Sequence, residues 1–420
     1  MTQIQCSSTD ANPLATQAGM FRGWRVVAGA FGVTLVGFGS AYTFSVFVAP
    51  LQQAFGASRG AASLVFSLAG FLYFGLGVLS GPLADRFGAR RLALAGMLLV
   101  GLGLALAGLA QRLEQVYLAY GLGVGLGVGL AYVPVLGAVQ RWFTRRRGLA
   151  SGLAVSGIGV GTLLLPPLAA LLVERLGWRG AYLSLGVLAL VLGLAAAWLV
   201  EDDPRRHGLG PDGDPPNAGA AARAAQGATV CEALRAPAFW RLYAACLLCS
   251  FSVFLPFVHL VPYAEAHGVP LASAVLLLGL IGIGSTAGRF LLGGLLDRIG
   301  RGRALLALFA GMALALAGWA LASGFWALAA FALVYGTVYG AWVAVLPAVV
   351  MDHFGGRSVS GIIGALYTSV AVGTLAGPTA AGFAFDLRHS YQWPIWLGVA
   401  LNVLAVGVML RQSSPAGARA

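Results

Sequence analysis

Long apolar stretches recur along this chain from one end to the other. Twelve of them are each long enough, at roughly 18 residues or more, to cross the hydrocarbon core of a bilayer as a helix. They fall at residues 24–50, 60–83, 91–110, 116–140, 147–172, 180–200, 238–264, 271–296, 303–323, 326–350, 358–384 and 391–411. Short alternating segments typical of membrane β-barrels are absent from the sequence. The pattern predicts an all-α membrane protein with twelve transmembrane helices.

A polar stretch divides these spans into two groups of six. It runs from Glu201 to about Arg235 and contains E-D-D-P-R-R and P-D-G-D-P-P, which are typical of a flexible linker. We therefore expect five parts: an N-terminal tail, a first six-helix bundle, a linker, a second six-helix bundle and a C-terminal tail. Their expected limits are 1–23, 24–200, 201–236, 237–411 and 412–420.

The two groups also carry a repeated motif. The second span is followed by G-P-L-A-D-R-F-G-A-R-R (81–91), and the eighth by G-G-L-L-D-R-I-G-R-G-R (293–303). Recurrence at the same place in each half indicates a duplicated six-helix unit. Such units usually bind their substrate at the interface of the two halves, near the midplane.

Composition and charge strengthen the membrane prediction. Hydrophobic residues make up 59% of the 420 residues and charged residues 10%, whereas a soluble domain carries about 25% charged residues. All 26 basic residues are arginines, and the net charge is +12. If the N-terminus is cytoplasmic, 20 arginines fall in inner segments and 5 in outer loops. This bias predicts a multi-pass protein of the plasma or inner membrane with both termini in the cytoplasm, rather than a nucleic-acid binder.

The sequence gives little support for a cofactor or a metal site. Cys246 and Cys249 form a C-x-x-C spacing, but inside an apolar helix without a histidine or acidic neighbour, which favours packing over redox or metal binding. We expect no cofactor and no metal. Residues 1–20 lack a basic n-region, so no cleaved signal peptide is expected.

The repeated motif resembles the loop signature of the major facilitator superfamily, and the resemblance covers essentially the whole chain. A second match is narrower. The segments R-W-F-T-R-R-R-G-L-A-S-G-L-A-V-S-G-I-G-V-G (141–161) and G-W-R-G-A-Y (177–182) resemble the monocarboxylate porter family, which includes bacterial lactate and pyruvate carriers and the related oxalate/formate exchangers. The resemblance implies the major facilitator fold, with two pseudo-symmetric six-helix bundles, and transport by alternating access.

Charged residues beside the loop motifs are the gating candidates. Acidic and basic neighbours at cytoplasmic helix ends can form charge-assisted hydrogen bonds between helices, and in the superfamily these loops latch the outward-open state. The alternative is that the arginines only anchor the loops. The candidates are Asp85, Arg86, Arg145, Asp297 and Arg298.

Arg289 is the charged residue that falls well inside a span. It lies in the eighth helix, about six residues or ~9 Å from the cytoplasmic end. A buried arginine is costly in a membrane unless it faces a wet cavity or a partner, and no acidic residue falls at matching depth. A substrate carboxylate, held by the two-pronged guanidinium, is the simplest partner. Snorkelling to the interface is the alternative. The porter family also carries its carboxylate-binding arginine in the eighth helix.

Further substrate contacts are expected from helices that face the cavity in the superfamily. A tyrosine supplies a hydroxyl for a carboxylate or hydroxy group and an apolar ring for a methyl group, although simple packing is the alternative for each. The candidates are Tyr132, Tyr339, Tyr367, Tyr42 and Ser156. His259, late in the seventh helix, is the proton-coupling candidate because histidine titrates near neutral pH.

Three positions depart from the relatives that the resemblance suggests. The oxalate exchangers carry a second cation in the eleventh helix, where this chain has Val370. One fixed cation neutralises one carboxylate, so a monocarboxylate is favoured. Ser285 and Tyr42 stand where the animal porters carry an acidic residue and a lysine, so their proton route cannot simply be transferred.

The expected function is therefore electroneutral proton symport of a small monocarboxylate such as lactate or pyruvate, by a chain that functions as a monomer in the bilayer. An oxalate/formate-like exchanger or another carrier of the same fold is one alternative, and a non-transporting membrane sensor is another. An enzyme is not expected, since no nucleophile, base and orienting acid coincide.

Overall fold

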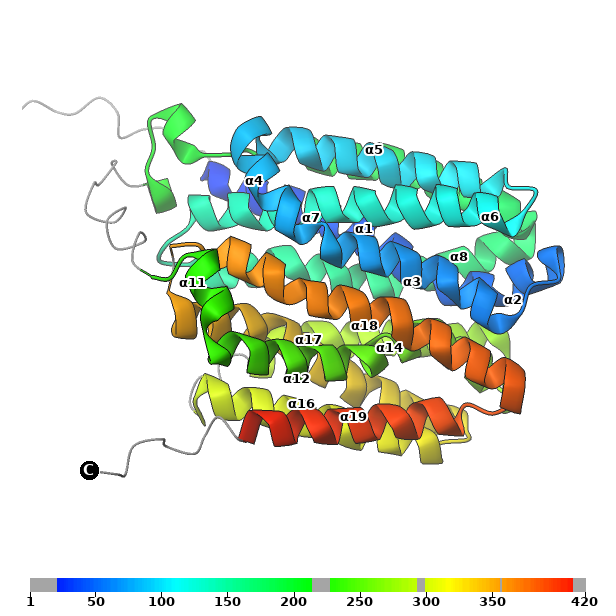
Figure 1. Cartoon of the computed structure of the whole chain (residues 1–420). Coiled ribbons are helices and arrows are strands. Elements are labelled where there is room, and N and C mark those ends of the chain that lie inside the picture. Colours follow the sequence, from blue (N-terminus) through cyan, green and yellow to red (C-terminus); the bar gives the residue numbers. More distant parts are fainter. Residues whose placement is uncertain (1–20, 214–226, 293–298, 356, 411–420) are drawn as a thin grey trace, which may run out of the picture.

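The computed structural model describes residues 21–213, 227–292, 299–355 and 357–410, and every regular element in these ranges is a helix. Figure 1 shows long helices that run side by side across the molecule. Most of the first half of the chain lies in the upper part of that view and most of the second half in the lower part. The chain thus forms two helical layers that meet along their length.

The bounds of the helices follow the expected spans closely. In the first half they are α1 (Arg22–Tyr42), α2 (Phe44–Phe55), α3 (Arg59–Gly75), α4 (Gly77–Phe87), α5 (Ala89–Gly108), α6 (Leu113–Val116), η1 (Tyr117–Leu122), α7 (Gly123–Trp142), α8 (Arg147–Leu188), η2 (Ala189–Gly193) and α9 (Leu194–Trp198). In the linker and second half they are η3 (Pro204–His207), η4 (Pro211–Gly213), α11 (Val230–Arg235), α12 (Pro237–Val253), α13 (Leu255–Ala266), α14 (Leu271–Ala287), η5 (Gly288–Leu292), α16 (Arg301–Leu321), α17 (Phe325–Phe354), α18 (Val359–Arg388) and α19 (Gln392–Leu410).

Length and hydropathy identify the membrane spans. Among the described residues, ten helices are long and apolar enough to cross a membrane, or up to eleven when the bent pair of α3 and α4 counts as one span. One of them, Gly148–Trp198, has 51 residues, and a straight helix of that length would measure about 77 Å. Gly177 interrupts it with non-helical backbone angles, so it contains two spans. The twelve-helix expectation is thereby accounted for.

The two halves repeat one another in detail. The first span is broken at Thr43 between α1 and α2, and the seventh is broken at Phe254 between α12 and α13. The glycines of the two motif copies, Gly88 and Gly300, have φ angles of 90° and 86°, a region that glycine adopts readily. Each precedes the next helix in its half, α5 or α16. These matching breaks and turns support the duplicated unit inferred from the sequence.

Glycines bring two helices of the second half into backbone contact. A Cβ added at Gly288 would clash with the carbonyl oxygen of Thr337, and one added at Gly340 would clash with that of Ser285. Close backbone approach through small residues is typical of membrane helices. It holds the turn that carries Arg289 directly against α17.

Hydrogen bonds join the two halves at one end of the bundle. The other end is called the arginine-rich end here, because α1 starts there and α4, α7 and α16 have their arginines there. It lies on the left in Figure 1. At the opposite end, the Asp386 carboxylate on α18 accepts hydrogen bonds from the backbone N–H groups of Arg59 (2.9 Å) and Gly60 (2.8 Å) on α3. The Arg59 guanidinium donates to the Tyr391 hydroxyl at 2.7 Å. These bonds between the halves close that end.

Candidate functional site

A cavity of about 290 Å³ lies between the two halves. It is lined by the last turns of α7 and α17, the first turns of α8 and α18, and Arg289 of η5. These turns place it in the part of the bundle nearest the arginine-rich end. The lining residues are Tyr132, Val133, Leu136, Gly137, Gln140, Gly148, Ser151, Gly152, Val155, Arg289, Val343, Ala344, Pro347, Met351, Val359, Ile363, Gly364 and Tyr367.

Arg289 is buried in the wall of this cavity, with 6% of its surface exposed. Its Nη1 donates to the backbone oxygen of Val155 on α8 at 3.2 Å. Its Nε and Nη2 have no hydrogen-bond partner in the part of the chain that the structure describes, and none of the described lining residues is acidic. The residue sits in a π-helical turn, a distortion often found at functional sites. Two free donors of a fixed fork can receive a carboxylate.

Two of the tyrosine candidates share the cavity with this guanidinium, and a third lies in an adjoining recess. Tyr132 and Tyr367 line the cavity together with Arg289. Tyr339 and Val370 line an adjoining recess of about 20 Å³, which shares Tyr132, Val343 and Tyr367 with the cavity. The structure therefore brings Arg289, Tyr132 and Tyr367 together, with Tyr339 and Val370 beside them.

Tyr42 is not among the residues that line the recess, but it belongs to an aromatic layer beside it. Its hydroxyl is hydrogen-bonded to that of Tyr339 at 3.0 Å, and its ring lies 4.3 Å from that of Phe257, centroid to centroid. Phe254 lies at the break in the seventh span, and the centroid of its ring is 5.3 Å from that of Phe74. The layer contains rings from both halves and borders the recess.

Two candidates lie apart from the cavity lining. Ser156 is buried, and its hydroxyl donates to the Leu153 oxygen of its own helix at 2.7 Å. His259 is fully buried, with Nε2 2.9 Å from the Pro378 oxygen and Nδ1 3.3 Å from the Tyr391 hydroxyl. It belongs to the cluster around Asp386 at the closed end, so the structure does not bring it together with Arg289.

The gating candidates are only partly described. Asp297, Arg298 and the side chain of Asp85 lie outside the described part of the structure. Arg86 is exposed and lines a surface pocket of about 440 Å³ at the arginine-rich end. The backbone N–H of Arg145 donates to the Asp212 carboxylate at 2.8 Å.

The first part of the linker is bound to the first half of the chain. Partial burial acts to raise the pKa of Asp212. Hydrogen bonds from the Thr144 hydroxyl and from the backbone of Arg145 and Thr144 outweigh this effect and hold the pKa below its usual range. Its carboxylate thereby ties η4 to the loop between α7 and α8. The described parts of the expected linker thus include short helices with specific contacts.

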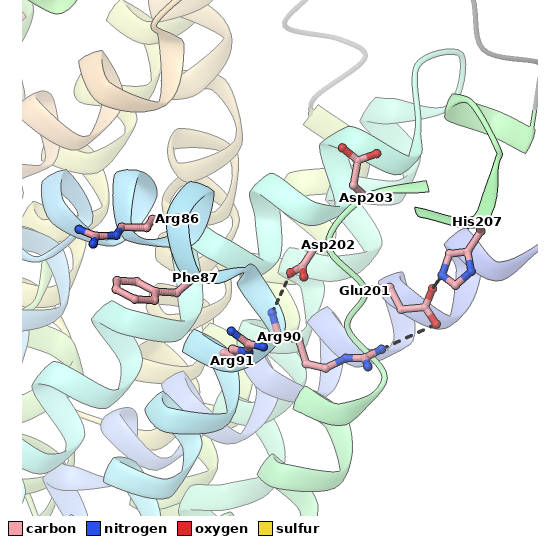
Figure 2. A pocket seen from close by; sticks show the side chains of 8 residues that line it. All are labelled: Arg86, Phe87, Arg90, Arg91, Glu201, Asp202, Asp203 and His207. Carbon is pink, nitrogen blue, oxygen red and sulfur yellow. Dashed lines mark hydrogen bonds and ion pairs between the residues drawn. The ribbon is translucent and has the colours of Figure 1, made fainter. Parts of the chain in front are cut away.

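Figure 2 shows a second set of such contacts in the surface pocket. The Asp202 carboxylate accepts from the backbone N–H of Arg90 at 3.1 Å, and the Glu201 carboxylate lies 3.8 Å from the Arg90 guanidinium and 2.8 Å from the His207 ring. These bonds connect the end of the sixth span to the start of the third. They join the start of the linker to the first half and do not link the two halves.

Sequence reasoning missed several residues at these sites. Ser151 and Gln140 line the cavity, and their polarity within apolar helices was an available signal. Asp386 and Arg59 close the opposite end, but nothing in a single sequence indicates that residues so far apart meet.

Known proteins resemble this chain over most of its length. Residues 29–378 match the family model described as Major Facilitator Superfamily. Monocarboxylate transporter 3 of Rattus norvegicus is 34% identical over 388 residues, covering 91% of this chain and 78% of that protein. Monocarboxylate transporter 12-B of Danio rerio is 32% identical over 403 residues, covering 90% and 84%.

A solved structure shares the fold at much lower sequence similarity. It is a bacterial homolog of the human lysosomal transporter Spinster, in an inward-facing and unoccupied conformation, with a TM-score of 0.70 and 16% identity over 96% of this chain and 100% of that one. The fold, the repeated motif and the relatives agree. The chain is a multi-pass membrane protein that belongs to the monocarboxylate porter family of the major facilitator superfamily.

Proposed function

We propose that this protein is a secondary active transporter that carries a small monocarboxylate, such as lactate or pyruvate, across the membrane. The observation that carries the proposal is Arg289, a buried guanidinium with two unpartnered donors in the wall of a cavity between the halves. Leaving a buried charge unpaired is costly. A carboxylate that enters the cavity would satisfy both donors at once.

The charge of the cavity favours one carboxylate over two. Arg289 is its cationic residue among the described lining, and Val370 supplies an apolar side chain to the adjoining recess. A second carboxylate would lie in low dielectric without a counter-charge. An oxalate/formate-like exchanger is therefore the less favoured alternative. The names of the relatives at 32–34% identity support the same substrate class.

The proposed mechanism is alternating access. The cavity lies toward the arginine-rich end, and the bonds of Asp386 together with the aromatic layer of Tyr42 close the other end. With the arginine-rich end in the cytoplasm, as the arginine bias favours, this conformation faces inward. The gate on the cytoplasmic side would use the loop charges Asp85, Arg86, Arg145, Asp297 and Arg298.

Proton coupling completes the proposal. Two routes are open: His259 takes the proton, or the proton travels with the substrate beside Arg289. The burial of His259 at the closed end, with both ring nitrogens near acceptors or hydroxyls, favours the second route. In either case one anion and one proton move together, by a monomer of the plasma or inner membrane.

The proposal is tested by transport in proteoliposomes. Labelled lactate should enter vesicles that contain the purified protein and not protein-free vesicles. Unlabelled pyruvate should compete at concentrations similar to those of lactate. Oxalate should bind at least about tenfold more weakly, which corresponds to about 1.4 kcal/mol of binding free energy. Competition by oxalate equal to that by pyruvate would favour the exchanger, and uptake no greater than in empty vesicles would contradict the proposal.

A further inference from the structure

The recess beside the cavity contains a buried hydrogen-bond donor without a partner. Trp342 of α17 lines the recess and is 3% exposed. Its indole Nε1 has no hydrogen-bond partner among the described residues. Buried tryptophan N–H groups normally find an acceptor. The wall of the recess therefore includes a tryptophan whose buried N–H has no acceptor of its own among the described residues.

The recess adjoins the space in front of Arg289. Tyr132, Val343 and Tyr367 line both the recess and the cavity. Trp342 immediately precedes Val343, and its ring lies 6.5 Å from that of Tyr339, one turn earlier on the same helix. A small acid whose carboxylate is held by Arg289 would thus lie beside residues that also form the wall of the recess.

Size and polarity define what fits the recess. Its volume of about 20 Å³ accommodates one water-sized group. Most of its wall is apolar, including Phe38, Ile158 and Leu346, and the Tyr339 hydroxyl is already hydrogen-bonded to Tyr42. A single oxygen atom that accepts a hydrogen bond matches this combination.

We propose that Trp342 recognises the oxygen on the carbon next to the carboxylate by donating its Nε1–H to it. The site then selects 2-oxo and 2-hydroxy monocarboxylates over short acids that lack this oxygen. A site with a dedicated hydrogen-bond donor discriminates against analogues that leave the donor unpaired. The inference rests on the proposed function and adds to it a specificity-determining residue.

Trp319 provides a matched control. It is fully buried on α16, its Nε1 also lacks a partner among the described residues, and its ring stacks on Phe331. It is not among the residues that line the cavity or the recess. Comparison of the two tryptophans therefore separates loss of a buried indole from loss of the donor at the recess.

The experiment measures equilibrium binding of lactate, pyruvate and propionate to the purified full-length protein. Propionate has the same carbon chain without the oxygen on C2. We expect Trp342→Phe to weaken lactate and pyruvate binding about tenfold, as for loss of one hydrogen bond, and to leave propionate binding unchanged. Trp319→Phe should leave all three affinities unchanged.

The outcomes distinguish this inference from the proposed function. If the unaltered protein binds none of the three acids, the proposed function fails. If it binds lactate, but Trp342→Phe weakens all three acids equally or weakens none, only the role of Trp342 is overturned. Should Trp342→Phe fail to fold, the isosteric amino acid 3-benzothienylalanine at position 342 removes the N–H and keeps the ring shape. The same loss of preference for lactate over propionate is then required.

Discussion

Arg289 combines a position inside a span with a nearly complete lack of hydrogen-bond partners. Its Nη1 contacts Val155, whereas Nε and Nη2 remain without a partner in the described structure. Tyr132 and Tyr367 share its cavity. A guanidinium held in this way is preorganised for a carboxylate, because little side-chain motion is needed on binding.

Replacement of this arginine should abolish tight binding. We expect Arg289→Gln and Arg289→Lys to lose on the order of 2–5 kcal/mol of monocarboxylate affinity, since even lysine lacks the two-pronged fork. Isothermal titration calorimetry with lactate measures this loss. Arg303→Gln, which changes an exposed arginine of α16, is the control and should bind normally. Unchanged affinity in either Arg289 variant would contradict its role.

Arg289 could be named as a candidate from the sequence because it is a charged residue inside an apolar span. The tyrosines Tyr132, Tyr339 and Tyr367 could be named because helices at this place in the superfamily face the cavity. Trp342 could not, since a further aromatic residue in an aromatic-rich span carries no distinguishing signal. Its significance depends on the missing acceptor and on the recess, which only the packed helices define.

Breaks within helices and close contacts between them shape the bundle around the cavity. No proline stands at Thr43 to mark the break between α1 and α2 in the sequence. Gly340, which contacts the backbone at Ser285, is one of 61 glycines, and nothing in the sequence sets it apart from the others. Hydropathy located the spans to within a few residues, because the bilayer fixes their length. It could not locate these breaks and contacts, which depend on the partner helix.

The contact between α3 and α18 at the closed end predicts a conformational effect. The Asp386 carboxylate accepts two N–H groups from the first turn of α3, and hydrogen bonds to a charged group contribute about 2 kcal/mol. Asp386→Asn should therefore weaken the closed end and favour the state that opens there. Spin labels on exposed Gln53 of α2 and Ala266 of α13 should report longer distances between the halves.

A carboxylate within one half gives the matched control for this measurement. Asp352 of α17 pairs with Arg301 of α16, both in the second half and at the arginine-rich end. Asp352→Asn should leave the distance distribution between the two labels unchanged. An identical distribution for Asp386→Asn and the unaltered protein would show that the closed end is held by the aromatic layer instead.

The described part of the molecule places a cavity between two repeated halves. The apolar spans and the repeated motif were sufficient to predict this fold, because membrane spans and duplication leave marks on the sequence. The conformation was not predictable. Which end closes depends on contacts such as those of Asp386 and Tyr42, made between residues hundreds of positions apart.

The proposed proton coupling depends on this whole arrangement. None of the described cavity-lining residues is acidic, so an entering carboxylate would pair with Arg289. Arg289 stays with the protein, and the accompanying proton would balance the charge that the anion carries across the membrane. Transport of one anion with one proton moves no net charge. It is therefore expected to follow the pH gradient and to be indifferent to the membrane potential.

The most direct test is lactate uptake into proteoliposomes under two separate driving forces. In one arm an inward proton gradient is imposed without a membrane potential, and in the other a potassium-diffusion potential is imposed without a proton gradient. Electroneutral symport predicts accumulation of lactate in the first arm and none in the second. Accumulation driven by the potential but not by the pH gradient would contradict it.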